Sequence, residues 1–422
     1  MQAWSRRRRW TLPALVIVLF FFDLFLAYQL PQIHERLSWR MEIYQAEVRQ
    51  FLLPHPQTLS TPEPQAAAMG RATLSAVAPT ATSTPPPQPS QPIPGPNSSS
   101  TPTSAPLPSR VMLTPPSHEY QLFNNCGPAT LAMTLRYWGW RGSQRDTAAI
   151  LKPVQDDRNV MPYEMVRYVQ DNTQLQALLR YAGTPDDLKR LIAAGFPPVV
   201  EKGFNVIENN LGWMGHYNLL TGYDDSKRVF VAQDSYEGPN YPVDYDTLLA
   251  GWRAFDFLYI VVFPPEREQE VLALLGANAD ETYNDQFAIQ HARQEVQALS
   301  GKDLAFAWFD LGTSLVTVRD YGPASYAFDQ ARYAGLPWRM LWYQTGPYFA
   351  YFYTGRYQDV IGLANETLDQ QEFLEESWYW RGMAKIALGD PKGGADDLRT
   401  ALSKHPGFPP ALAELQQLGA HP

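Results

Sequence analysis

The sequence has a single cysteine, Cys126, among its 422 residues. A disulfide within the chain and a cysteine-based zinc site are therefore both excluded. The seven histidines are scattered, and neither a His-Glu-x-x-His motif nor a glycine-rich phosphate loop occurs. We therefore expect no metal, no nucleotide and no other cofactor.

Positive charge is also scarce. Lys and Arg together number 34 against 43 Asp and Glu, which gives a formal net charge of -9. Because phosphate binding needs a basic face, this balance argues against a nucleic-acid partner. Aromatic residues make up 13% of the chain and gather after residue 117, so the later part is expected to bury sizeable cores.

The chain opens with a basic cluster and a long apolar run. Residues 1–9 include four consecutive arginines, and residues 10–30 are long enough to cross a bilayer as one helix. No clear signal-peptidase site follows. We expect a single N-terminal transmembrane helix acting as a signal anchor, with residues 1–9 cytoplasmic and the rest outside the cytoplasm at the cell membrane. The spacing of residues 31–53 predicts a juxtamembrane helix.

Residues 54–117 differ sharply in composition from the later part of the chain. They hold 17 of the 37 prolines, together with many Ser, Thr, Ala and Gln residues. A segment of this composition cannot bury enough apolar surface to fold and favours extended conformations. It is expected to be a disordered linker between the membrane and the folded domains.

The first folded domain is expected over 118–265. The apolar spacing after Cys126 predicts a helix that Gly139 ends, with Asn124 or Asn125 as its cap. Cys126 then lies at a helix N-terminus, where the helix dipole and free N–H groups lower the pKa of a thiol. A thiolate is the attacking species of cysteine hydrolases.

A base and an orienting carboxylate occur further along the chain. His216 opens a predicted strand that ends near Asp224, and the returning strand ends at Asp234. Such a hairpin brings Asp234 beside His216, as the third member of a catalytic triad requires. Asp224 and Asp225 are competitors at the turn, and His118, ahead of the motif, is expected to be a solvated entry residue.

Other residues near these motifs are candidates for binding. Gln121 can donate its side-chain N–H to a developing oxyanion, beside the backbone N–H of Cys126. We assign substrate contacts to Asn125, Gly127, Trp213 and Gly215. Residues 209–214 are either a loop over the site that influences substrate choice or an ordinary turn with one packed tryptophan.

Three motifs together resemble one known family. They are Gln-x-x-Asn-Asn-Cys-Gly-Pro-Ala (121–129), Gly-His-Tyr-x-x-x-Thr-Gly-Tyr-Asp (215–224) and Gln-Asp-Ser-Tyr (233–236). The set resembles the peptidase C39-like family over about residues 120–264. The resemblance implies a papain-like α+β fold and thiol peptidase chemistry. It also implies that Cys126, His216 and Asp234 match the family's triad and Gln121 its oxyanion-hole glutamine.

The best-known members of that family cut leader peptides after paired glycines and are fused to export ATPases. This chain has no P-loop and a single expected span, so a leader-peptide substrate does not follow from the resemblance.

Residues 266–422 are predicted to be entirely helical, with helices over 266–275 and 285–299 joining the domains. Similar units then recur at about 34 residues, the tetratricopeptide period. The residues that recur in these units are Trp308, Leu311, Gly312, Tyr321, Ala324, Phe328, Ala331 and Pro337; Tyr351, Gly355, Arg356, Tyr357 and Ala364; and Trp378, Gly382, Gly389, Leu398, Ala401 and Pro406. The units resemble tetratricopeptide repeats, which either bind a peptide or protein or form a helical cap without a ligand.

The leading hypothesis is a membrane-anchored thiol hydrolase that cleaves peptide bonds outside the cytoplasm, with the repeats recruiting substrate or partner. A second hypothesis is an inactive scaffold in which only the repeats bind. A third is an amidase or transpeptidase acting on cell-wall peptides with the same triad.

Overall fold

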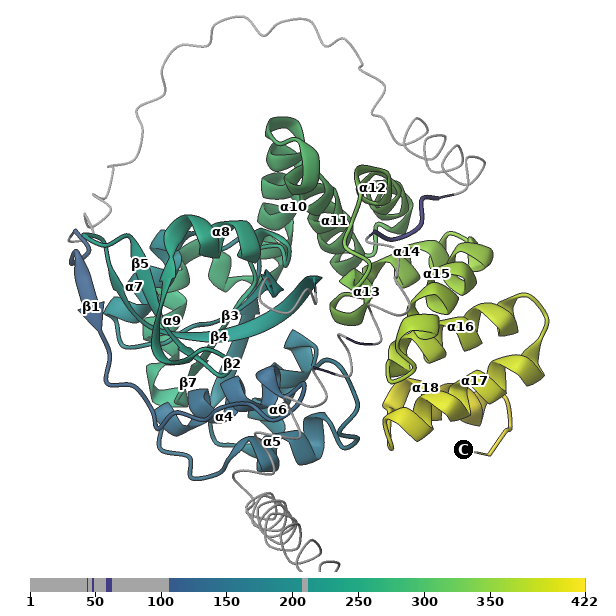
Figure 1. Cartoon of the computed structure of the whole chain (residues 1–422), viewed down its shortest axis with the longest axis horizontal. Helices are drawn as coiled ribbons and strands as arrows, with labels where there is room; N and C mark the ends of the chain where they lie inside the picture. The colour runs from purple at the N-terminus through teal and green to yellow at the C-terminus, as the bar shows by residue number, and fades with distance from the viewer. Residues whose placement is uncertain (1–43, 45–47, 49–57, 63–105, 207–211, 422) are drawn as a thin grey trace, which may run out of the picture.

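The computed structural model describes residues 44, 48, 58–62, 106–206 and 212–421. These residues form an α+β part followed by an all-helical part (Figure 1). The predicted membrane span at 10–30 and nearly all of the predicted helix at 31–53 lie outside the described residues. Where the structure does describe the chain, none of its helices has the length and apolar character needed to cross a membrane.

The α+β part is built on one antiparallel sheet. Its strands are β1 (Arg110–Met112), β2 (Gln176–Arg180), β3 (Val199–Val206), β4 (Gly212–Asp224), β5 (Val229–Asp234), β6 (Gly238–Asp244) and β7 (Tyr259–Phe263). The spatial order is β2-β7-β3-β4-β5-β6, and β1 also pairs with β4. The long strand β4 therefore lies at the centre and carries His216.

Helices cover both faces of this sheet. They are α4 (Cys126–Tyr137), α5 (Gln144–Leu151), α6 (Pro162–Asn172), α7 (Pro185–Ala193), α8 (Tyr245–Arg253) and α9 (Glu268–Leu275). Along β7, Tyr259, Val261 and Phe263 pack with α7, α8 and α9, whereas Ile260 and Val262 pack with α4 and α6. Successive side chains of a strand point to opposite faces, so an unbroken apolar run supplies both cores.

Local sequence sets the helix ends much as expected. The predicted helix after Cys126 is α4, and Gly139 follows it with φ +91°, a conformation that residues with a side chain rarely adopt. Helix α7 begins directly after Thr184. The Thr184 side chain accepts a hydrogen bond from the N–H of Asp187, and Pro185 occupies the first turn.

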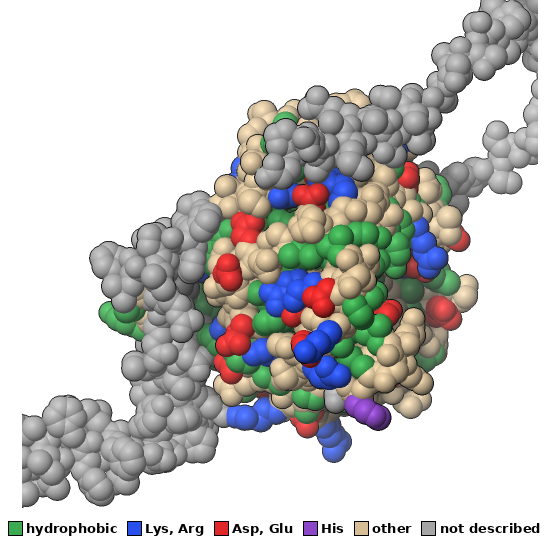
Figure 2. All heavy atoms as spheres, turned by 90° about the vertical axis from the view of Figure 1, so that its right-hand side faces the viewer, with side chains coloured by type: hydrophobic (Ala, Val, Ile, Leu, Met, Phe, Trp, Pro, Cys, Tyr) green, Lys and Arg blue, Asp and Glu red, His purple; other side chains and the backbone are tan. Residues whose placement is uncertain are grey.

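The second part consists of helices alone among its described residues. They are α10 (Glu281–Ala298), α11 (Gly301–Thr317), α12 (Tyr321–Ala334), α13 (Met340–Tyr343), α14 (Gly346–Tyr353), α15 (Tyr357–Gln370), α16 (Glu375–Ala387), α17 (Pro391–Lys404) and α18 (Pro409–Gln417). They form a layered array beside the sheet (Figure 1). On its outer face, Lys and Arg side chains are interspersed with Asp and Glu (Figure 2).

Small residues stand where paired helices approach most closely. A Cβ added at Gly312 of α11 would lie 2.6 Å from the ring of Phe328 on α12. A Cβ added at Gly382 of α16 would lie 2.9 Å from the carbonyl oxygen of Gly394 on α17. Both glycines belong to the recurring units found in the sequence, so the helical region is consistent with repeats.

The two parts share a continuous core. Trp213 of β4 stacks on Phe255 at 5.8 Å between ring centroids and meets Tyr343 of α13 edge-on at 5.7 Å. The Gln344 side chain donates a hydrogen bond to the carbonyl of Ala254 at 2.6 Å. The N-terminal end of β4, which leads to His216, is thus fixed by helices from the second part.

Part of the predicted disordered linker has a defined place. The side chain of Leu59 is only 3% exposed, and its N–H donates to the carbonyl of Leu336 at 3.0 Å. The N–H of Ser60 donates to Glu366, and Arg332 donates to the carbonyl of Ser60 at 2.8 Å. Residues 58–62 are therefore held against the helical region, because a leucine side chain and three backbone groups find partners there.

The sheet also begins before residue 118. Arg110 of β1 pairs with Asp224 of β4, and Met112 pairs with Gly222. A Cβ on Gly222 would lie 2.6 Å from the Met112 sulfur, so the two strands are in close contact. Composition did not reveal this strand because three residues beside a proline-rich tract give no measurable alternation.

Candidate active site

A buried glutamine fixes the loop that leads to Cys126. The Gln144 side chain, 3% exposed, accepts hydrogen bonds from the Leu122 N–H at 2.7 Å and from the Asn125 side chain at 2.9 Å. It also donates to the carbonyl of Tyr120 at 2.7 Å. These bonds join the loop to the first residue of α5 and so hold it in place ahead of α4.

Cys126 is the first residue of α4 and is partly exposed. The Thr130 hydroxyl donates to the carbonyl of Tyr217 on β4 at 3.2 Å, so the first turn of the helix lies against that strand. The predicted cap residue Asn125 does stand at the N-cap, although its side chain bonds Gln144 rather than the helix N–H groups. The free N–H groups of the first turn therefore remain close to the sulfur.

His216 and Asp234 lie in direct contact. The Nε2 of His216 is 2.8 Å from Oδ1 of Asp234, and both side chains are almost fully buried. The expected hairpin produces this contact, because β4 and β5 pair in a register that sets Leu219 opposite Gln233. The Cys126 sulfur and the His216 ring lie near enough to influence each other's ionisation. Since Nε2 bonds Asp234, Nδ1 is the ring nitrogen that is left to interact with the sulfur.

The Asp234 carboxylate is itself held by several donors. Oδ1 accepts from the N–H groups of Tyr236 at 2.8 Å and Glu237 at 3.1 Å, and Oδ2 accepts from the Asn218 side chain at 2.8 Å. These bonds fix the orientation of the carboxylate, which in turn fixes the plane of the His216 ring.

The three groups shift one another's pKa values in the directions that favour a charged pair. Burial would lower the pKa of His216, but the negative charge and hydrogen bond of Asp234 outweigh it and raise that pKa to about 9. Burial would raise the pKa of the Cys126 thiol, yet the hydrogen bond and charge of His216 lower it. Burial opposes ionisation of Asp234 too, but His216 holds its pKa well below the ordinary value. Each of these shifts favours a thiolate–imidazolium pair.

The side chain of Gln121 is oriented by its neighbour. Its Oε1 accepts a hydrogen bond from the Ser235 hydroxyl at 2.8 Å, and its backbone N–H donates to the carbonyl of Ser235 at 2.9 Å. Because Oε1 is engaged as an acceptor, the amide NH₂ is the end that can donate to a substrate oxygen. Ser235 follows Asp234 directly, so one strand end positions two of the candidate residues.

The four predicted substrate contacts have different surroundings. Asn125 bonds Gln144, and a Cβ added at Gly127 would lie 3.2 Å from the Cβ of Val160. A Cβ at Gly215 would meet the rings of Phe255 and Tyr343 at 2.8 Å. Residues 212–214 belong to strand β4 rather than a loop, and the Trp213 side chain is 8% exposed in the shared core. Residues 209–211 lie outside the described residues.

His118 was expected to be solvated, and the structure differs. Its ring packs edge-on against Tyr120 at 4.8 Å, and both ring nitrogens are buried, with no hydrogen-bond partner among the residues that the structure describes. Burial lowers the pKa of His118, with Asp234 opposing the shift. His118 is partly buried because the loop that follows it, residues 119–125, folds back toward Ser235.

Sequence reasoning missed three residues around the site. Asn218 lies two residues after His216 on the same strand face, and this period of two could have revealed it. Lys202 of β3 pairs with His216 across the sheet, and its charge helps to keep Asp234 ionised. Tyr343, from the helical region, packs against Gly215, and no sequence pattern links the two.

Comparisons with known proteins agree with the α+β part of the chain. Residues 112–260 match the model of the Peptidase_C39 like family. The resemblance predicted from the three motifs is therefore confirmed for this domain, and the match supports a peptidase-type function.

Two solved structures are similar to this chain. One is a C39-like peptidase from Bacillus anthracis, with 16% identity, 36% of this chain and 96% of that chain covered, and a TM-score of 0.29. The other is a double glycine motif protease from an AMS/PCAT transporter in complex with the leader peptide, with 17% identity, 36% and 94% coverage, and a TM-score of 0.27. No curated protein matches the chain.

Proposed function

We propose that this chain is a thiol peptidase with Cys126 as its nucleophile. The observation that carries the proposal is the 2.8 Å contact between His216 and Asp234, together with Cys126 at the N-terminus of α4, where the thiol and the imidazole shift each other's pKa. A buried imidazole between a sulfur and a carboxylate is the arrangement that activates a thiol for acyl transfer.

Each residue has a definite task in this chemistry. The Cys126 thiolate attacks the scissile carbonyl, and the developing oxyanion is stabilised by the Cys126 N–H and the Gln121 side chain. His216 gives its proton to the leaving amine, then removes a proton from the water that hydrolyses the thioester. Asp234 keeps the imidazolium charged and aligned, and Asn218 keeps Asp234 in place.

The remaining parts of the chain give this activity a location. We propose that residues 10–30 anchor the protein in the cell membrane with the peptidase domain outside the cytoplasm. The helical region, as a tetratricopeptide-like array, would then recruit the peptide or protein that is cut. The match to the C39-like family supports a peptide as the substrate class.

The test is labelling of the full-length chain with iodoacetamide near pH 7.5. Because Cys126 is the only cysteine, every label reports on this site. We expect fast labelling in the wild type, loss of labelling and of peptide cleavage in Cys126→Ala, and slow labelling in His216→Ala. His421→Ala, which removes an exposed histidine, is the matched control and should label like the wild type.

Two results would overturn the assignment. Cleavage of peptides by Cys126→Ala would show that another group is the nucleophile. Equal labelling rates in the wild type and His216→Ala would show that the thiol is not activated, and the scaffold hypothesis would then account for the protein better.

A further inference from the structure

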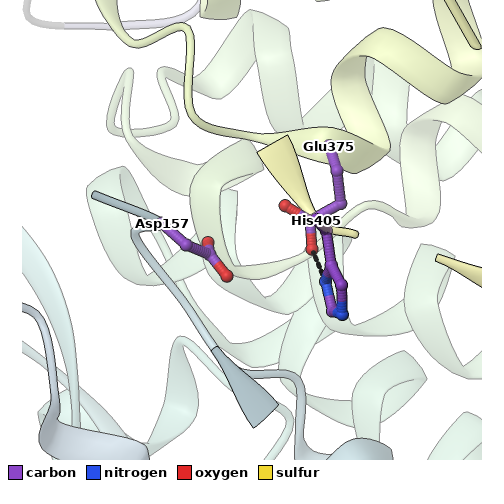
Figure 3. A group of neighbouring side chains, drawn as sticks. All are labelled: Asp157, Glu375 and His405. Atoms are coloured by element: carbon purple, nitrogen blue, oxygen red, sulfur yellow. Dashed lines mark hydrogen bonds and ion pairs between the residues drawn. The ribbon is translucent and has the colours of Figure 1, made fainter. Parts of the chain in front are cut away.

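Three potential metal ligands that are distant in the sequence meet between the peptidase domain and the helical region. Asp157 lies in the loop between α5 and α6, Glu375 is the first residue of α16, and His405 follows α17. One donor atom from each lies within 4.8 Å of the others (Figure 3). The site is separate from Cys126 and His216, so it does not depend on the proposed function.

The donors face one another inside the protein. Asp157 and Glu375 are each 3% exposed. The Nδ1 of His405 is 2.7 Å from Oε1 of Glu375. The second oxygen of Glu375, Oε2, is buried and has no hydrogen-bond partner among the described residues. Figure 3 shows this carboxylate directed between His405 and Asp157. A buried carboxylate oxygen without a donor is costly unless a cation or a proton satisfies it.

The nearest lysine does not provide that cation. The Lys152 ammonium donates its hydrogen bonds to three backbone carbonyls: those of Phe123 at 3.3 Å, Asn124 at 3.2 Å and Asp157 at 2.8 Å. An ammonium group has three protons, so these bonds use its full donor capacity. The Asp157 carboxylate accepts a long bond of 3.3 Å from the N–H of Asn159.

Further negative charge surrounds the cluster. Glu164 is close enough to influence the ionisation of Glu375, and Glu375 in turn influences that of Glu376. Glu164 accepts a hydrogen bond from the N–H of Met161 at 2.8 Å, which engages only one of its oxygens. Among the described residues, four carboxyl groups thus gather near His405, and Lys152 and Arg158 are the neighbouring cationic side chains.

We propose that Asp157, Glu375 and His405 bind a divalent transition-metal cation, with Zn²⁺ as the best match to this donor set. Two carboxylates and one imidazole are hard-to-borderline ligands that suit Zn²⁺ or Mn²⁺. Ligands about 2.1 Å from a tetrahedral ion lie roughly 3.4 Å apart, so small side-chain rotations close the present spacing. Nδ1 of His405 turns from Glu375 to the metal, and water completes the coordination.

Such an ion would join the two parts of the chain. Glu375 and His405 belong to the last helices, whereas Asp157 belongs to the loop that Lys152 ties to the backbone just ahead of Cys126. Binding would therefore stabilise the docking of the helical region on the peptidase domain, since an ion that binds only the folded arrangement favours it.

The experiment uses the full-length chain carrying Cys126→Ala. This background removes the thiolate, which would otherwise bind Zn²⁺ together with His216 and imitate the proposed site. The protein is stripped with a chelator and titrated with Zn²⁺ and Mn²⁺ against a chromophoric competitor. Bound metal per chain is counted by mass spectrometry, and the unfolding temperature is followed with and without metal.

Three variants in the same background locate the ion. Glu375→Gln keeps the size of the side chain and a hydrogen-bonding partner for His405, and Asp157→Asn keeps the shape of the loop. Asp156→Asn is the matched control, because Asp156 is the exposed neighbour of Asp157.

We expect one Zn²⁺ per chain in the background protein and in Asp156→Asn, with a rise in unfolding temperature. Glu375→Gln and Asp157→Asn should lose affinity by at least the 10–100-fold that removal of an outer-shell partner costs. The proposal is overturned if the stripped background protein binds no Zn²⁺ or Mn²⁺, since the carboxyl groups then hold protons instead. It is equally overturned if Glu375→Gln and Asp157→Asn bind metal as tightly as Asp156→Asn.

Discussion

Asp234 is the residue whose replacement tests the proposed mechanism most directly. Asp234→Asn removes one negative charge and keeps an oxygen that can accept from the N–H groups of Tyr236 and Glu237. The His216 ring then loses the charge that offsets its burial. The expected consequence is a neutral imidazole near pH 7 and a Cys126 thiol that is no longer ionised.

The size of the effect follows from the pKa of His216. Its value of about 9 against an ordinary 6.5 corresponds to about 3 kcal/mol in favour of the imidazolium. Because Asp234 provides the main charge that opposes burial, its removal should cost about that amount. The alkylation rate of Cys126 at pH 7.5 should then fall by roughly a hundredfold.

The assay is the rate of iodoacetamide labelling as a function of pH. Wild type should label efficiently over a broad neutral range and lose the ion pair as pH rises through about 9, where His216 loses its proton. In Asp234→Asn the pair should be absent, and the rate should rise only above the ordinary thiol pKa of about 8.5, because burial then raises the pKa of Cys126 unopposed. Asp224→Asn is the control, because Asp224 lies at the other end of β4 and bonds Ser226.

Stability should change with pH in the same sense. A folded-state pKa above the unfolded value stabilises the fold below the unfolded pKa, so the His216 contribution is complete below about pH 6.5 and is lost between 6.5 and 9. This contribution should be missing in Asp234→Asn. If the variant keeps the wild-type labelling profile, Asp234 does not control the imidazole and the reasoning fails.

Three further changes have defined outcomes. Gln121→Ala should lower kcat for peptide cleavage by about 10²–10³-fold and leave the rate of Cys126 labelling unchanged. Both the cleavage rate and the labelling rate are measured, and an unchanged kcat would exclude Gln121 from the oxyanion hole. Leu59→Asp places a carboxylate in an apolar site, so hydrogen exchange at residues 58–62 should rise to that of a free segment, and unchanged protection would contradict the docking. Burial raises the pKa of Asp310, so the stability of the wild type falls as pH rises above about 4. Asp310→Asn should therefore raise the unfolding temperature at pH 7 but not below pH 4. Equal unfolding temperatures of the variant and the wild type at pH 7 would contradict this.

Much of the candidate site was predictable because its residues lie in short local patterns. The helix that starts at Cys126 follows from apolar spacing and from Gly139, which the structure holds at φ +91°. The contact between His216 and Asp234 follows from the hairpin of β4 and β5, whose register sets Leu219 opposite Gln233. Both arguments use only period and turn chemistry, which act over a few residues.

Other features needed contacts that no local pattern contains. Trp213 was predicted in a loop or turn, yet it lies in a strand and in the core shared with α13, because the apolar face that receives it comes from residues far along the chain. The strand β1 and the docked segment 58–62 stand within proline-rich sequence, where composition favours disorder. In each case tertiary packing outweighed local propensity.

The sequence by itself indicated the candidate reactive residues and the order of the α+β and helical parts. Motifs with reactive side chains and the periodicity of helices and strands are both local features of the sequence. Only the tertiary structure decided which face of the helical region meets the peptidase domain. It also decided that Asp157, Glu375 and His405 come together. These tertiary contacts join residues about 30 to more than 200 positions apart in the sequence. They depend on the summed burial of many side chains rather than on any motif.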